Sequence, residues 1–242
     1  MIAYAKVVAS VGICLAFLLN FPGVCSAQQS AVTAIDIALE PDATMIRHAE
    51  ATNARLRSVF PKGFALDASH HPHITLLQRY VRTADLDKVC SAASKVLSND
   101  NVTSLKLEAY KYYYITDKSL PGIGLSGIVV KTTPELEKLQ ADLIAAVAPF
   151  TLAKGTAAAY VTTPADPNIN DATIRYVEVY VPEHSGKNLE LHVTTGIASP
   201  EYLEKMVAEP FKDFTFSPIG VSVYHLGNFG TAAAKLKDLK VK

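Results

Sequence analysis

Two stretches of this sequence repeat one order of predicted elements: strand, helix, strand, helix, strand. The first covers residues 31–116 and the second covers residues 122–227. β-Branched and apolar runs indicate the strands, and apolar residues at helical spacing indicate the helices between them. The two stretches share little identity, so the repeat is one of topology. We therefore expect one α+β domain with two lobes, spanning residues 28–242.

The middle strand of each stretch carries the same short motif. His73-Ile74-Thr75 lies in "HPHITLL", and His192-Val193-Thr194 lies in "LHVTTG". Residues i and i+2 of a strand point to the same face, so each histidine projects with its threonine. If the two middle strands lie side by side about a pseudo-twofold axis, two imidazoles and two hydroxyls meet in one cleft.

Such a set of groups suits the cleavage of a phosphodiester. One neutral imidazole takes a proton from water, and the other, protonated, gives a proton to the leaving ribose oxygen. The hydroxyls donate to the phosphate oxygens as charge builds on them. An imidazole pKa of about 6.5 suits both roles near neutral pH. The sequence thus predicts His73 and His192 as catalytic residues, and Thr75 and Thr194 as substrate-binding residues.

Paired His-x-Thr strands in a duplicated α+β chain resemble the 2H phosphoesterase superfamily, which includes RNA 2′-5′ ligase-like proteins and cyclic phosphodiesterases. The resemblance implies antiparallel or mixed sheets around a central cleft, with helices outside. It also implies that a cyclic 2′,3′-phosphate or a 2′-5′ linkage in a nucleotide or RNA fragment is cleaved or formed without metal or cofactor. The second motif departs from the family, since Thr195 and Gly196 stand where an apolar residue is usual, and the strand is expected to end early or bulge there.

Two other functions fit the same residues. One is a non-catalytic module that binds phosphate or a nucleotide on the same scaffold. The other is a metal-dependent hydrolase, because His70, His71 and His73 are clustered. Neither a cysteine nor a second histidine pair lies at ligand spacing nearby, which argues against the metal site. Two tyrosines, Tyr113 and Tyr224, are further candidates for substrate binding, because an aromatic ring can stack on a base.

Residues 1–27 have the pattern of a signal peptide. Lys6 precedes an unbroken apolar run, and "PGVCSA" supplies small residues for cleavage after Ala27. We expect a secreted or periplasmic protein that leaves the membrane once the peptide is cleaved. Cys90 is then the one remaining cysteine, so no intrachain disulfide is expected. The 23 basic and 23 acidic residues balance, so no net field marks the protein as a binder of nucleic-acid chains or membrane surfaces. We also expect a monomer without a protein partner.

Three remaining segments complete the predictions. Residues 150–188 interrupt the second stretch and are expected to add a hairpin and a mobile loop. The tail from residue 231 to residue 242 is expected to be helical or frayed. The "GIGLSG" segment matches a dinucleotide-binding glycine pattern, but it precedes a strand rather than a helix, so we predict a turn.

Overall fold

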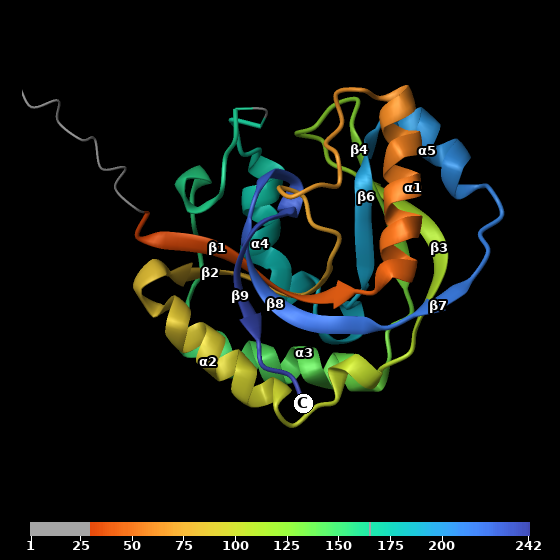
Figure 1. The fold of residues 1–242 in the computed structure, drawn as a ribbon. Helices are drawn as coiled ribbons and strands as arrows, with labels where there is room; N and C mark the ends of the chain where they lie inside the picture. The colour runs from red at the N-terminus through yellow and green to blue at the C-terminus, as the bar shows by residue number, and fades with distance from the viewer. Residues whose placement is uncertain (1–29, 165) are drawn as a thin grey trace, which may run out of the picture.

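The computed structural model describes residues 30–164 and 166–242, and these form an α+β fold with two antiparallel sheets (Figure 1). Short 3-10 turns join several of the elements. The helices and strands are β1 (Val32–Pro41), α1 (Ala43–Val59), β2 (Ile74–Arg82), α2 (Leu86–Leu97), β3 (Leu107–Thr116), β4 (Gly124–Val130), α3 (Pro134–Val147), β5 (Thr151–Leu152), α4 (Asp171–Glu183), β6 (His192–Ala198), α5 (Pro200–Val207), β7 (Phe214–Phe216), β8 (Pro218–Leu226) and β9 (Ala232–Leu239).

The two sheets bring the motif strands close to each other. The first sheet has the order β5-β2-β1-β8-β9, and the second has the order β6-β4-β3-β7. β2 follows directly from His73, and β6 begins at His192. These two strands contact each other where the sheets meet. The fold class predicted from the sequence is therefore confirmed, with a motif strand in each sheet.

Each of the two sheets contains strands from both predicted halves, residues 31–116 and 122–227. β3, from the first stretch, pairs with β4 of the second sheet, and β8, from the second stretch, pairs with β1 of the first sheet. The short turn between β3 and β4 makes them a hairpin, which favours pairing of strands adjacent in the chain. Each lobe is thus built from both halves of the chain.

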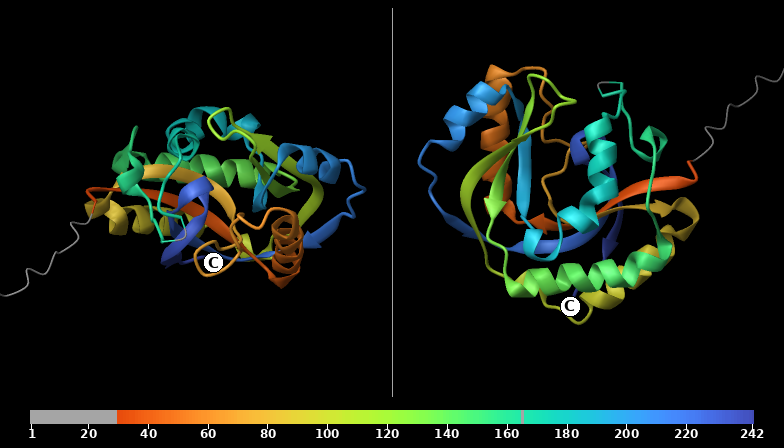
Figure 2. Two further views of the ribbon diagram at one scale, coloured as in Figure 1. Left: turned by 90° about the horizontal axis from the view of Figure 1, so that it is seen from above. Right: turned by 180° about the vertical axis from the view of Figure 1, so that it is seen from behind.

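Helices α1, α2, α3 and α5 cover the outer faces of the sheets, whereas α4 contacts β2 and lies on the side of the pocket (Figure 2). α2 and α3 pack together beneath the first sheet, while α1 contacts β6 and α5 contacts β3 of the second. Asp42 caps α1, because its carboxylate accepts hydrogen bonds from the Thr44 and Met45 amides. Thr133 caps α3 in the same way, with Pro134 in the first turn.

Two predicted segments fold differently. Residues 150–188 contain helix α4 where a hairpin was expected. The side chains of Thr173, Val177 and Tyr180 are buried at helical spacing, and the Asn170 side chain caps the first turn. The C-terminal tail contains β9, which pairs with β8 along the edge of the first sheet. A helix of this length would be only marginally stable on its own, whereas the strand gains backbone hydrogen bonds to β8.

The predicted signal peptide lies outside the described residues. Within residues 30–164 and 166–242, no helix combines the length and the apolar character that crossing a bilayer requires.

Candidate active site

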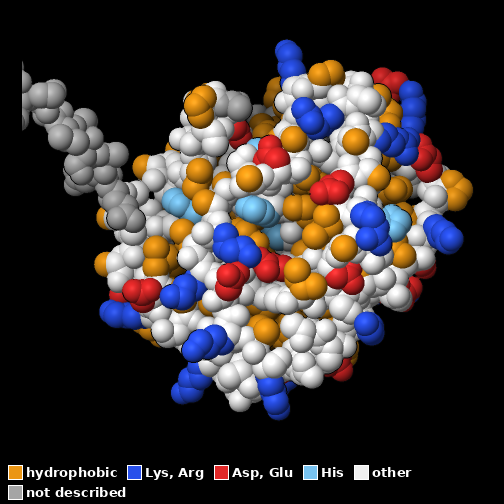
Figure 3. All heavy atoms as spheres, viewed as in Figure 1, with side chains coloured by type: hydrophobic (Ala, Val, Ile, Leu, Met, Phe, Trp, Pro, Cys, Tyr) orange, Lys and Arg blue, Asp and Glu red, His pale blue; other side chains and the backbone are white. Residues whose placement is uncertain are grey.

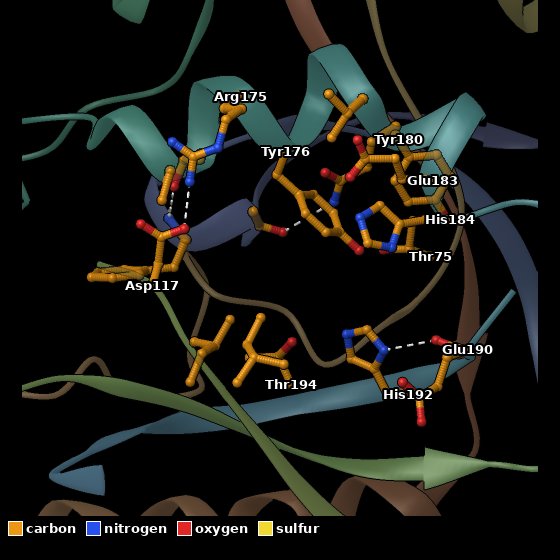
Figure 4. A pocket seen from close by; sticks show the side chains of 18 of the residues that line it. Thr75, Asp117, Arg175, Tyr176, Tyr180, Glu183, His184, Glu190, His192 and Thr194 are labelled. Carbon is orange, nitrogen blue, oxygen red and sulfur yellow. Dashed lines mark hydrogen bonds and ion pairs between the residues drawn. The ribbon is translucent and has the colours of Figure 1, made fainter. Parts of the chain in front are cut away.

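A pocket of about 310 Å³ lies where the two motif strands meet. His73, Thr75, His192, Thr194 and Tyr113 all line it. α4 stands opposite β6 and supplies the facing wall of the pocket (Figure 4). Five of the six predicted site residues are therefore brought together, although the two motifs are more than 100 residues apart in the chain.

The two histidines are held in the same way. Nδ1 of His73 donates to the carbonyl of His71 at 2.7 Å. Nδ1 of His192 donates to the carbonyl of Glu190 at 2.9 Å (Figure 4). In both motifs the acceptor is the residue two positions earlier. A donating Nδ1 fixes the orientation of the ring and leaves Nε2 as the atom that exchanges a proton. The pseudo-twofold repeat thus extends to the hydrogen bonds of the catalytic candidates.

A β-bulge follows the threonine in both motifs. In β2 the register skips Leu76, because Ile37 pairs with Leu77 while Ala38 pairs with Thr75. In β6 the register skips Thr195, which lies between the paired residues Thr194 and Gly196. Bulges bend a strand and redirect side chains, and they are common beside active sites. The unusual "TTG" sequence is therefore a bulge, as expected, and its position beyond Thr194 leaves that threonine in the pocket wall.

Each bulge is held by a buried amide side chain from a helix. Nδ2 of Asn53, on α1, donates to the carbonyl of Thr195 at 2.9 Å. Nε2 of Gln140, on α3, donates to the carbonyl of Leu76 at 3.0 Å. Both amides are almost fully buried, so each hydrogen bond is made away from water. Neither amide was singled out in the sequence, where they stand among ordinary helical polar residues.

Gly196 is expected to be required for the bulge in β6. Its φ is +143°, and a Cβ at this position would lie 3.0 Å from Nδ2 of Asn53 and 3.2 Å from Cδ1 of Leu56. We expect Gly196→Ala to reduce the free energy of unfolding by about 1–3 kcal/mol, the usual cost of a side chain in such a conformation. Urea unfolding measures the change.

Gly220→Ala is the matched control, because its added Cβ would meet only Oε2 of Glu40, at 3.5 Å. Equal stability losses in the two variants would contradict the role of Gly196.

A buried carboxylate lies beneath the first motif. Asp36, on β1, is fully buried, and its Oδ2 accepts hydrogen bonds from Oγ1 of Thr75 at 2.6 Å and Nε2 of Gln78 at 3.0 Å. Nε2 of His73 is 3.4 Å from the same oxygen. The other oxygen, Oδ1, is buried without a hydrogen-bond partner among the described residues. A buried carboxylate needs a compensating charge, and His73 is the cation placed to supply it.

The two imidazoles have pKa values displaced in opposite directions. Burial acts to lower the pKa of His73, but the contact with Asp36 and its negative charge outweigh burial and raise it above the usual value. Burial lowers the pKa of His192, and the hydrogen bond to Glu190 and the charge on His73 act more weakly in opposite senses. The two environments therefore favour the protonated form of His73 and the neutral form of His192. The sequence motifs are alike, and Asp36 distinguishes them.

The two predicted tyrosines lie in different places. The Tyr113 ring contacts the ring of His192, with centroids 4.8 Å apart. Gly127 makes room for it, because a Cβ there would lie 2.5 Å from Cε1 of Tyr113. Tyr224, in contrast, is buried outside the pocket, and its hydroxyl donates to Glu40 at 2.6 Å. Tyr224 is therefore not placed to contact a ligand in this pocket.

α4 contributes a wall that was not predicted. Tyr176 and Tyr180 line the pocket from this helix, as do Glu183 and the following His184 (Figure 4). The Tyr176 ring lies 4.5 Å from the ring of His184. These residues were overlooked because the segment was interpreted as a hairpin and loop. The helical spacing of the apolar residues in "TIRYVEVY" was the available signal.

The clustered histidines of the first motif have separate partners. His70 stacks on Phe64 at 4.9 Å and contacts Asp67, whereas the ring of His71 lies 5.5 Å from that of Tyr224. Among the described residues, no group of three or more His, Cys, Asp or Glu side chains is arranged to hold a metal ion. The "GIGLSG" segment is a turn at Gly122 leading into β4, as predicted.

Comparison with known proteins gives similar solved structures and no sequence match. TT0787 of Thermus thermophilus is 14% identical, with 86% of this chain and 97% of that chain covered and a TM-score of 0.49. E. coli LigT complexed with phosphate is 12% identical, with coverage of 88% and 99% and a TM-score of 0.40. Kluyveromyces marxianus Usb1 is 8% identical, with coverage of 86% and 98% and a TM-score of 0.42. No family model matches the chain, and no curated protein matches it.

The described residues form the arrangement of sheets and motifs that the sequence predicts. Two antiparallel sheets meet at a pocket, each sheet contributes one His-x-Thr motif, and helices cover the outside. The chain thus has the two-sheet α+β fold that its resemblance to the 2H phosphoesterases implies.

Proposed function

We propose that this protein is a metal-independent phosphoesterase that cleaves a 2′,3′-cyclic phosphate or a 2′-5′ phosphodiester. The observation that carries the proposal is the meeting of His73 and His192 in one pocket, with their pKa values displaced in opposite directions. An acid and a base of unlike pKa on the same phosphate are what a proton-transfer mechanism needs.

In this mechanism His192 is the general base and His73 is the general acid. Nε2 of His192 takes a proton from water as the water oxygen attacks phosphorus. The bond from phosphorus to one ribose oxygen breaks, and that oxygen receives the proton from Nε2 of His73. The products are a phosphomonoester and a free ribose hydroxyl. Solvent then takes up the proton from His192 and reprotonates His73, which restores the starting state.

The two threonines differ in what their hydroxyls are free to do. Oγ1 of Thr75 already donates its proton to Asp36, whereas Oγ1 of Thr194 makes no hydrogen bond within the described part of the chain. We expect Thr194→Val to lower kcat by about 10–10³-fold, because a donor to the phosphate oxygens is lost. Thr75→Val is expected to lower kcat less. Steady-state kinetics of both variants, with the Ser substitutions as controls, measure the difference. A larger loss for Thr75→Val would contradict this assignment.

Turnover of a 2′,3′-cyclic mononucleotide in the presence of a chelator tests the proposal. We expect a nucleoside monophosphate to form at the same rate with and without the chelator. A non-catalytic binding module would bind the cyclic nucleotide and yield no product. A metal-dependent hydrolase would lose activity with the chelator and regain it when zinc is added. Either of these results would overturn the proposal.

A further inference from the structure

The charged side chains that line the pocket are mostly acidic. Arg175 is the one lysine or arginine among the described lining residues, and it forms an ion pair with Asp117, another lining residue. Glu183, beside His184 at the end of α4, and Glu190, beside His192, also line the pocket, and both are exposed (Figure 4). Glu190 forms an exposed ion pair with Lys111, which does not line the pocket. Among the described lining residues, the histidines are therefore the remaining groups that can carry an unpaired positive charge, and His73 is the one whose pKa is raised.

The rest of the wall is largely apolar. The hairpin between β3 and β4 and the facing side of α4 supply aliphatic side chains to the end of the pocket beyond Thr194, namely Ile115, Leu120, Ile123, Leu125 and Val179. The ion pair between Arg175 and Asp117 joins these two elements, so it braces the apolar end (Figure 4). A volume of about 310 Å³ is at the small end of the range for small-molecule sites.

The charges on the protein surface are of both signs (Figure 3). On the face drawn in Figure 3, acidic and basic side chains are interspersed. Proteins that bind nucleic-acid chains gain most of their affinity from lysine and arginine contacts to successive phosphates. A pocket whose described lining has three carboxylates and one arginine, itself paired with Asp117, is suited to a ligand with one phosphate.

We infer that the substrate is a nucleoside-sized phosphodiester with a single phosphate charge and a neutral, largely apolar group, and that Glu183 and Glu190 select against a second phosphate. This inference rests on the proposed function. The reacting phosphate lies between the histidines, and the neutral group occupies the apolar end. A second phosphate in the pocket would meet the carboxylate of Glu183 or Glu190, and like charges placed together are unfavourable.

Three substrates with the same reacting group test the inference: a nucleoside 2′,3′-cyclic phosphate, its 5′-phosphorylated form, and a trinucleotide that ends in the cyclic phosphate. We expect kcat/KM to be highest for the first, by about 10-fold or more over the others at low salt. Because the two glutamates are exposed, added salt is expected to reduce this preference. Glu183→Gln and Glu190→Gln should each reduce it as well.

Glu178→Gln is the matched control, because Glu178 is on the same helix as Glu183 and does not line the pocket. It should leave the preference unchanged. Equal kcat/KM for all three substrates, or a preference for the trinucleotide that weakens with salt, would overturn the inference and leave the proposed function standing. If none of the three is cleaved, the proposed function fails and the inference fails with it.

Discussion

His73→Ala and His192→Ala are each expected to lower kcat for a 2′,3′-cyclic nucleotide by about 10²–10⁴-fold, the usual contribution of a positioned general acid or base. Both rings line the same pocket, and each is oriented by a hydrogen bond to the carbonyl two residues earlier. Because the two groups act on one transition state, the double variant should be little slower than either single variant.

His70→Ala and His71→Ala are the matched controls, because these histidines are in the same segment and do not line the pocket. We expect them to alter KM at most. Multiplicative losses in the double variant would show that the histidines act on separate steps. A loss in His71→Ala as large as that in His73→Ala, with activity restored by zinc, would instead indicate a metal site.

Asp36→Asn is expected to lower kcat/KM above pH 7 by about 10–10²-fold, which is part of the full contribution of a general acid. The Asp36 carboxylate keeps the pKa of His73 above its usual value in spite of burial. Without that charge, burial dominates and His73 loses its proton at lower pH, so the alkaline limb of the pH–rate profile should move toward acid. The acid limb, which His192 sets, should move little, although Asp36 has a weak effect on the pKa of His192 as well.

This shift of one limb separates the role of Asp36 from a purely structural one, which would lower the rate at every pH alike. Glu40→Gln is the matched control, because Glu40 is on the same strand and its carboxylate contacts Lys235, Tyr224 and Ser222 outside the pocket. It should leave both limbs in place. An Asp36→Asn profile with the same alkaline limb as the wild type would contradict the assigned role.

Local sequence patterns were sufficient for most elements of the fold. β-Branched and apolar runs identified strands such as β2 and β6, and apolar residues at helical spacing identified the helices between the strands, because these patterns depend on neighbouring residues. The exchange of β3 and β8 between the sheets could not be predicted in this way. It depends on which strand edges are adjacent in space.

The site was predictable as far as the motif residues. The asymmetry between the two histidines was not, because it arises from a residue on a different strand. Asp36 stands between Ile35 and Ile37 in a strand that is buried along most of its length. A charged residue in such a run was the available signal, since buried carboxylates are uncommon unless paired. The bulges after Thr75 and Thr194 leave no comparable local signal, apart from Gly196.

The central claim is that His192 and His73 act as base and acid on one phosphodiester, and the pH dependence of kcat/KM in the wild type and the two alanine variants tests it most directly. The wild type should have a bell-shaped profile. Its acid limb lies below the usual imidazole pKa, because His192 must be neutral, and its alkaline limb lies above it, because His73 must be protonated. The residual activity of His192→Ala should lack the acid limb, and that of His73→Ala should lack the alkaline limb. Loss of the opposite limb in each variant, or both limbs surviving in either, would contradict the account.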